Sequence, residues 1–138
     1  DKSQMSVSEL GLSDHFIFTG MVDYEQIPTY INIADICVLP KRKLKSGYSP
    51  IKLYEYMACG KPVISSKAEG LEFIEEEGIG RVIDPENTVS FKEAMKGLIQ
   101  DRKKREAMGE RALFIARKRF DWEIKVIEIE KILRELLA

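Results

Sequence analysis

Short apolar segments alternate with helix-like patterns along the first two thirds of the chain. Four of these segments are apolar throughout or nearly so, as expected of strands buried on both faces of a sheet. These predicted strands are His15–Thr19, Ile36–Leu39, Pro62–Ser65 and Gly80–Ile83. Between them, apolar residues at helical spacing predict helices over Glu25–Asn32, Pro50–Cys59 and Leu71–Glu76. The alternation indicates an α/β fold with a parallel sheet of about four strands and flanking helices.

From Ser90 onward the pattern is purely helical and predicts a helical C-terminal tail. Three apolar stripes run along this tail at helical spacing, and we expect each of them to face the core. They comprise Phe91, Ala94, Met95, Leu98 and Ile99; then Met108, Ala112 and Ile115; then Trp122, Val126, Ile129, Leu133 and Leu136. The highly charged run Arg102–Arg111 is expected to form a solvated face.

Length and charge limit the classes of protein to consider. The 138 residues fit one domain. Lys and Arg number 22 against 23 Asp and Glu, and this balance argues against a general nucleic-acid binder. Cys37 and Cys59 are too few for a disulfide scaffold and lack metal-ligand spacing, so we expect reduced thiols in a cytoplasmic protein. No apolar run suggests a signal peptide or a membrane span.

One stretch, Ser46–Ser65, has strong local signals. Ser49 is a preferred N-cap and Pro50 fits the first helical position, so this pair predicts a helix start. Gly60, with Pro62 behind it, predicts the helix end.

Within this helix Lys52 and Glu55 share one face and interrupt a largely apolar surface. One interpretation is an intrahelical ion pair, although a Lys in the first turn opposes the helix dipole. The other is an anion site: a diphosphate binds the free N–H groups of the helix start, Lys52 complements it, and Glu55 accepts hydrogen bonds from ribose hydroxyls. Gly47 would let a ligand approach the backbone. The stretch follows a predicted strand, at the carboxyl edge where open α/β sheets bind ligands.

Five segments resemble a known family. They are Phe18–Gly20, Ala34–Pro40, Glu55–Ile64 (EYMACGKPVI), Gly80–Pro85 and Phe120–Trp122. Together they resemble the C-terminal, nucleotide-sugar-binding domain of GT-B glycosyltransferases, and more narrowly the glycosyl transferases group 1 family of retaining enzymes. The resemblance covers nearly the whole chain and implies a Rossmann-like parallel sheet.

The resemblance also implies roles for particular residues. Glu55 matches the second Glu of the family's Glu-x(7)-Glu motif, which holds the donor ribose. Gly47 stands where the first Glu would contact the donor sugar, so the sugar contact departs from the family's pattern. Gly20 and Met21 match the backbone that faces the nucleobase. The predicted donor-binding residues are Gly47, Tyr48, Ser49, Pro50, Ile51, Lys52, Glu55, Gly20 and Met21. We assign no catalytic residue, no metal and no cofactor other than the nucleoside diphosphate sugar, with UDP or GDP as the expected carrier.

Relative to this family, residues 1–138 lack two strand–helix units that precede the first predicted strand, and also the N-terminal acceptor domain. The implied function is donor binding in a retaining hexosyltransferase whose acceptor lies in solution or at a membrane periphery. The alternative is a non-catalytic nucleotide-binding or interaction module. The expected partners are the nucleotide-sugar donor and either the missing half of the enzyme or a second copy. The chain alone is predicted to be inactive.

Overall fold

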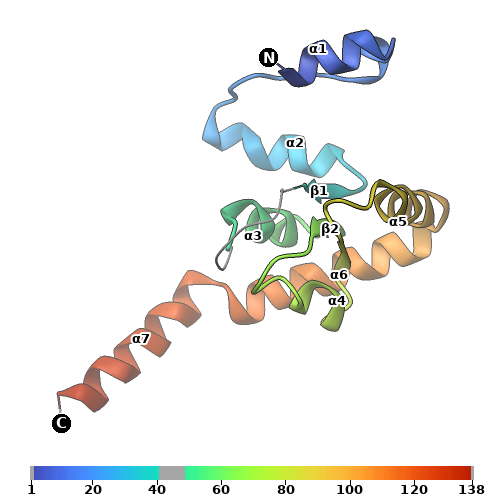
Figure 1. The fold of residues 1–138 in the computed structure, drawn as a ribbon. Coiled ribbons are helices and arrows are strands. Elements are labelled where there is room, and N and C mark those ends of the chain that lie inside the picture. Colours follow the sequence, from blue (N-terminus) through green and yellow to red (C-terminus); the bar gives the residue numbers. More distant parts are fainter. Residues whose placement is uncertain (1, 41–48, 138) are drawn as a thin grey trace.

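The structure is a computed structural model, and it describes residues 2–40 and 49–137. In chain order the elements are α1 (Lys2–Glu9), the 3-10 turns η1 (Ser13–His15) and η2 (Tyr24–Gln26), α2 (Ile27–Ile33), β1 (Cys37–Leu39), α3 (Ile51–Ala58), β2 (Val63–Ser66), α4 (Phe73–Glu76), β3 (Gly80–Ile83), α5 (Thr88–Gln100), α6 (Arg102–Arg119) and α7 (Trp122–Leu136). Figure 1 shows α1 and α7 extending from a central body that contains the strands. None of the described helices combines the length and apolar character needed to cross a bilayer.

The described strands form one parallel sheet in the order β1-β2-β3. Cys37 pairs with Val63, and Val63 in turn pairs with Gly80. Each pair of neighbouring strands is joined by a crossover that contains a helix, α3 and then α4, because parallel strands cannot be joined by a tight turn. This confirms the predicted α/β, Rossmann-like class.

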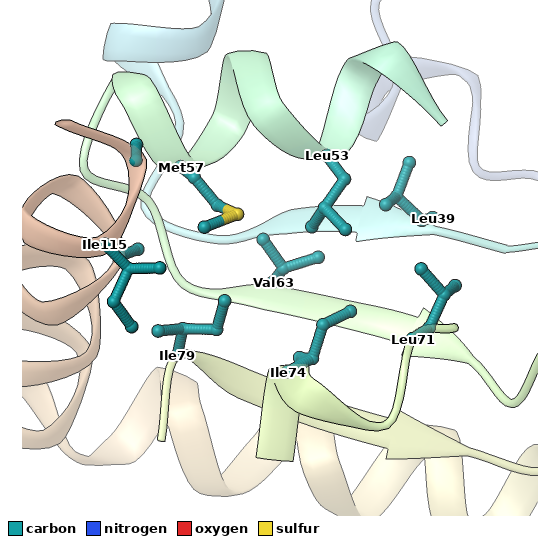
Figure 2. Packing of buried hydrophobic residues seen from close by; sticks show 10 residues of the cluster. Leu39, Leu53, Met57, Val63, Leu71, Ile74, Ile79 and Ile115 are labelled. Atoms are coloured by element: carbon teal, nitrogen blue, oxygen red, sulfur yellow. The ribbon is translucent and has the colours of Figure 1, made fainter. Parts of the chain in front are cut away.

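The main core lies between the sheet, α3, α4 and the middle of α6. Figure 2 shows Leu53 and Met57 on α3 directed toward Val63, and all three are fully buried. Ile74 and Ile115 join the same cluster from α4 and α6. α5 packs against β2 and β3, with Leu98 buried.

Two glycines permit the closest backbone contacts in this core. A Cβ on Gly80 would collide with the carbonyl oxygen of Val63 in the neighbouring strand. A Cβ on Gly109 of α6 would collide with the carbonyl oxygen of Gly60, at the end of α3. α3 and α6 therefore pack backbone against backbone at this point.

The predicted strand His15–Thr19 is wrong, and the described sheet has three strands where about four were expected. His15 ends the turn η1, and Phe16 has extended backbone angles without a place in the sheet. Ile17 is 92% exposed. An extended apolar run becomes a strand only when a neighbour pairs with its backbone groups, and no described strand does so here.

The C-terminal stripes have different outcomes. In α5 Leu98 is buried as predicted, although Ile99 is exposed. In α6 Ala112 and Ile115 are buried, which confirms the second stripe. The third stripe is wrong as a core face, because its five residues on α7 are between 52% and 80% exposed. α7 points away from the body of the molecule, so no described element covers that stripe (Figure 1).

The charged run at the start of α6 is largely solvated as expected, but Arg105 and Arg111 also bind other elements. The Arg105 guanidinium donates to the carbonyl oxygens of Leu98 and Ile99, both at 2.7 Å. It therefore satisfies the last carbonyls of α5 and fixes the corner between α5 and α6.

Candidate functional site

Among the described residues, no side chain caps the beginning of α3. The helix starts at Ile51, and Pro50 occupies the N-cap position with extended backbone angles. The sequence prediction was therefore wrong by one residue, because it placed Ser49 at the cap and Pro50 inside the helix. The Ser49 hydroxyl instead hydrogen-bonds the Tyr54 hydroxyl at 2.8 Å. By contrast, side-chain oxygens cap the three long helices α5, α6 and α7, and these come from Asn87, Asp101 and Asp121.

The end of α3 matches the prediction. Gly60 adopts φ of 65°, in the left-handed region that favours glycine. Its N–H donates to the carbonyl oxygen of Met57 at 3.0 Å, and the N–H of Lys61 donates to that of Tyr56 at 3.0 Å. This is the Schellman arrangement that terminates helices.

Lys52 and Glu55 do not form the ion pair that one interpretation proposed. Within the described residues, neither side chain makes a hydrogen bond or an ion pair with another protein group. Lys52 is exposed and Glu55 is half-buried. Both charges therefore remain available to a ligand, as the second interpretation requires.

Glu55 lines a cavity of about 430 Å³ that lies between α3, the end of α6 and the first turn of α7. Ile51 also lines this cavity, so it reaches the uncapped start of α3. Its wall includes Tyr54 and Phe120, whose ring centroids are 4.8 Å apart. Tyr24, from the turn before α2, completes the lining on another side.

The remaining predicted donor-binding residues are placed as follows. Gly20 has φ of 67° and Met21 is fully exposed, but neither lines the cavity. Tyr24, which follows them closely in sequence, does line it. Ser49 and Pro50 flank the start of α3. Gly47 and Tyr48 lie outside the described residues.

Sequence reasoning missed several residues that line the cavity. Arg117 follows the charged run Arg102–Arg111 and was given no role, and Trp122 was assigned to a core stripe. Phe120 was noted only as part of a segment that resembles the family. One local signal could have located Trp122. It directly follows Asp121, a preferred N-cap residue, and so stands at the first position of a helix rather than in its interior.

The two cysteine thiols lie outside the cavity lining. Burial raises the pKa of Cys37 to about 11, against a smaller lowering by the nearby Lys61. Burial also raises the pKa of Cys59. Both thiols are therefore protonated at neutral pH and are weak nucleophiles. The described residues contain no group of three or more His, Cys, Asp or Glu side chains placed to hold a metal ion.

The parallel sheet with helical crossovers places this chain in the class of Rossmann-like α/β folds, whose ligands bind at the carboxyl edge of the sheet, where α3 begins. The family model "Glycosyl transferases group 1" matches residues 1–113, and the chain belongs to this family.

Known proteins resemble the chain over nearly its whole length. Sucrose-phosphate synthase from Thermosynechococcus elongatus is 28% identical with a TM-score of 0.86, over 99% of this chain and 34% of that one. The Anabaena protein HepE, solved in complex with UDP, is 26% identical with a TM-score of 0.81, over 99% of this chain and 35% of that one. HepE has also been solved in complex with UDP-glucose.

A curated relative, the GDP-mannose-dependent alpha-(1-6)-phosphatidylinositol monomannoside mannosyltransferase of Mycolicibacterium smegmatis, is 26% identical over 94% of this chain and 35% of its own length. The chain thus spans about a third of the length of these relatives.

Proposed function

We propose that the chain is the donor-binding part of a retaining glycosyltransferase that moves a hexose from a nucleoside diphosphate sugar to an acceptor hydroxyl. The observation that carries this proposal is Glu55, a half-buried carboxylate that lines a cavity and has no partner among the described residues. A carboxylate taken partly out of water is costly unless it is hydrogen-bonded, so an unpartnered one in a cavity indicates a ligand with donor groups. The vicinal hydroxyls of a ribose are such donors.

The start of α3 provides the complementary half of the site. The N–H of Leu53 donates to the carbonyl oxygen of Pro50 at 3.0 Å. The N–H groups before it lie too early in the helix for intrahelical acceptors, and no side chain of the described residues caps them. Together with the Lys52 ammonium they offer positive potential to a diphosphate. In the transfer reaction negative charge grows on the departing diphosphate, and donors fixed in advance stabilise that charge. The complexes of HepE with UDP and with UDP-glucose support this assignment of the ligand class.

We further propose that this unit works with the remainder of a longer enzyme, in the cytoplasm, on an acceptor in solution or at a membrane periphery. The length of the relatives supports this, because this chain spans about a third of them. The two missing strand–helix units and the acceptor domain would lie in that remainder.

The alternative function is a non-catalytic nucleotide-binding module. Its support is Gly47, which stands eight residues before Glu55 where the family has the Glu that contacts the sugar. A module of this kind binds UDP and UDP-glucose equally, whereas a donor site gains affinity from the sugar. Comparing the two affinities separates the functions.

The test of donor binding is amide chemical-shift mapping and calorimetry on the chain with UDP and GDP. We expect shifts at Ser49–Glu55 and a Kd that Glu55→Ala weakens by more than about tenfold, since a hydrogen bond to a charged group contributes about 1.5–3 kcal/mol. The matched control is Glu93→Ala, which removes an exposed carboxylate on α5 without a partner among the described residues. Shifts confined to other segments, or no binding at millimolar nucleotide, would contradict the proposal.

A further inference from the structure

The last strand of the sheet, β3, has one edge that no described strand covers. The N–H of Val63 donates to the carbonyl oxygen of Ile79 at 3.2 Å, so this carbonyl faces β2. The carbonyl of Ile83 also faces β2, where it accepts from Lys67 at 2.6 Å. Because the backbone groups of a strand alternate between its two sides, those of Val82 point away from β2. This edge can therefore accept a further strand.

Beside this edge lies the β3 groove, a space of about 520 Å³ between β3, α5 and the start of α6. Val82 lines it from the strand, and Ala94 and Leu98 line it from α5. A Cβ on Gly97, which also lines it, would meet no atom within 4 Å, so the groove is open at this point. Its charged rim includes Lys104, whose side chain forms no ion pair within the described residues. A free strand edge beside a groove is the geometry with which proteins bind an extended peptide as an added strand.

The chain also contains an extended segment that lacks a strand to pair with, Phe16–Thr19. Phe16 has φ of −125° and ψ of 134°, and its ring stacks on that of Phe18 with the centroids 6.1 Å apart. Side chains two residues apart lie on the same side of an extended chain, so this stacking fits a strand conformation. Within the described residues the N–H groups of Ile17, Phe18 and Thr19 donate to no backbone acceptor, and the Ile17 side chain is 92% exposed.

In its own copy this segment lies far from the β3 groove. It leads through α2 into β1, the strand at the opposite edge of the sheet from β3. Figure 1 shows the segment between α1 and α2, away from α5. The β3 groove is therefore open to the segment of a second copy.

Charge favours one orientation for such a pairing. α5 begins soon after β3 and runs back along the sheet, so its corner with α6 lies at the amino edge. Arg105 confirms this position, because it lies 3.5 Å from the carboxylate of Asp35, just before β1. Lys104 belongs to the same corner. A segment that runs parallel to β3 brings Asp14, which precedes it and forms no ion pair within the described residues, toward Lys104.

We propose that the β3 groove binds the Phe16–Thr19 segment of a second copy as an added strand parallel to β3. The segment and β3 (Gly80–Ile83) are both four residues long, so their backbone groups match along the whole strand. Each copy offers one segment and one groove, so the contact is head-to-tail and further copies extend the assembly. The inference concerns the chain by itself and does not rest on donor binding.

Two substitutions block the two sides of this contact separately. Gly97→Glu places a long acidic side chain in the groove, and the open space at this position allows the variant to fold. Ile17→Lys blocks the segment. Light scattering during gel filtration should show that each variant alone associates with a Kd at least about tenfold higher than the wild type. The matched control is Ile99→Glu, at an exposed position of α5 outside the groove lining, and it should associate like the wild type.

A mixture of the two variants gives the sharper result. The Gly97→Glu copy still offers its segment and the Ile17→Lys copy still offers its groove. An equimolar mixture should therefore form a complex of two chains and no larger species. If the segment paired instead with the β1 edge of a second copy, Gly97→Glu would associate like the wild type.

The orientation has its own test. Lys104→Glu should weaken association about fivefold, the upper range for an exposed ion pair, and Asp14→Lys in the same chain should restore it. Circular dichroism of each variant verifies the fold. Wild-type association by Gly97→Glu, a mixture that contains only single chains, or a wild-type chain that stays single at all concentrations would overturn the strand addition. A Lys104→Glu defect that Asp14→Lys does not restore would overturn the parallel pairing.

Discussion

Some charged side chains in this molecule tie elements of the fold together, and others face the cavity. Glu77, at the end of α4, accepts bonds from Arg111 and Arg119 and so ties α4 to α6. Such partly exposed pairs contribute only about 0–1 kcal/mol each, but they leave no charge unsatisfied. Glu55 and Arg117 have no such partners among the described residues. This contrast between neighbouring charges supports a ligand role for the unpaired ones.

Cys37 gives a prediction about the pH dependence of stability. Burial raises its pKa from 9.0 to about 11 in the folded state, so the folded state holds the proton more tightly than the unfolded chain does. This contribution to stability is fully present below the unfolded pKa and is lost as pH rises through the folded pKa. We expect the free energy of unfolding, measured in urea, to fall as the pH rises between 9.0 and about 11.

The control for this prediction compares two variants. Cys37→Val should flatten the decrease, while Cys59→Val, at a less buried position, should retain most of it. Other groups titrate in the same range in all three proteins, so the difference between their slopes is the informative quantity. A Cys37→Val protein with the wild-type slope would show that the buried thiol is not responsible.

Between elements, the contact of α3 with α6 depends on a glycine. A Cβ at Gly109 would collide with the carbonyl oxygen of Gly60, which the Schellman turn holds in place. We expect Gly109→Ala to destabilise the protein by about 1–3 kcal/mol, the usual cost of overpacking, despite the better helix propensity of alanine.

Gly97 of α5 is the matched position, because a Cβ there meets no neighbouring atom. Gly97→Ala should stabilise the protein by about 0.5–1 kcal/mol, as expected for Gly to Ala in a helix. Urea unfolding of both variants measures the two effects. Equal stability of the two variants would mean that α6 shifts away from α3 without cost.

Elements could be predicted from the sequence where local signals suffice. The Gly60 stop and the strand at Gly80–Ile83 were correct to the residue, because turn chemistry and a short apolar run specify them. The strand at His15–Thr19 and the core role of the α7 stripe were wrong, since each depends on a neighbour that apolar pattern alone cannot supply. The cavity could not be predicted, because its walls come from segments far apart in sequence.

At the scale of the whole molecule, the chain leaves surfaces that its own described elements do not cover. β1 is an edge strand of the sheet, with Cys37 and Leu39 buried but one row of backbone groups unpaired with any described strand. Ile17 of the extended segment before η2 is 92% exposed, and the stripe of α7 is exposed as well. Edges and apolar faces of this kind favour association with another polypeptide.

We therefore predict that the isolated chain self-associates and transfers no sugar by itself. Light scattering during gel filtration should show a mass above 15.8 kDa that increases with concentration. Ile17→Lys should weaken the association, because a charge on an exposed extended segment opposes pairing with another strand. Val89→Lys, a substitution at an exposed apolar position of α5, should leave it unchanged. A transfer assay with UDP-glucose and GDP-mannose on the same sample tests the predicted absence of sugar transfer. A stable monomer that transfers sugar unaided would overturn the prediction that this unit needs a partner.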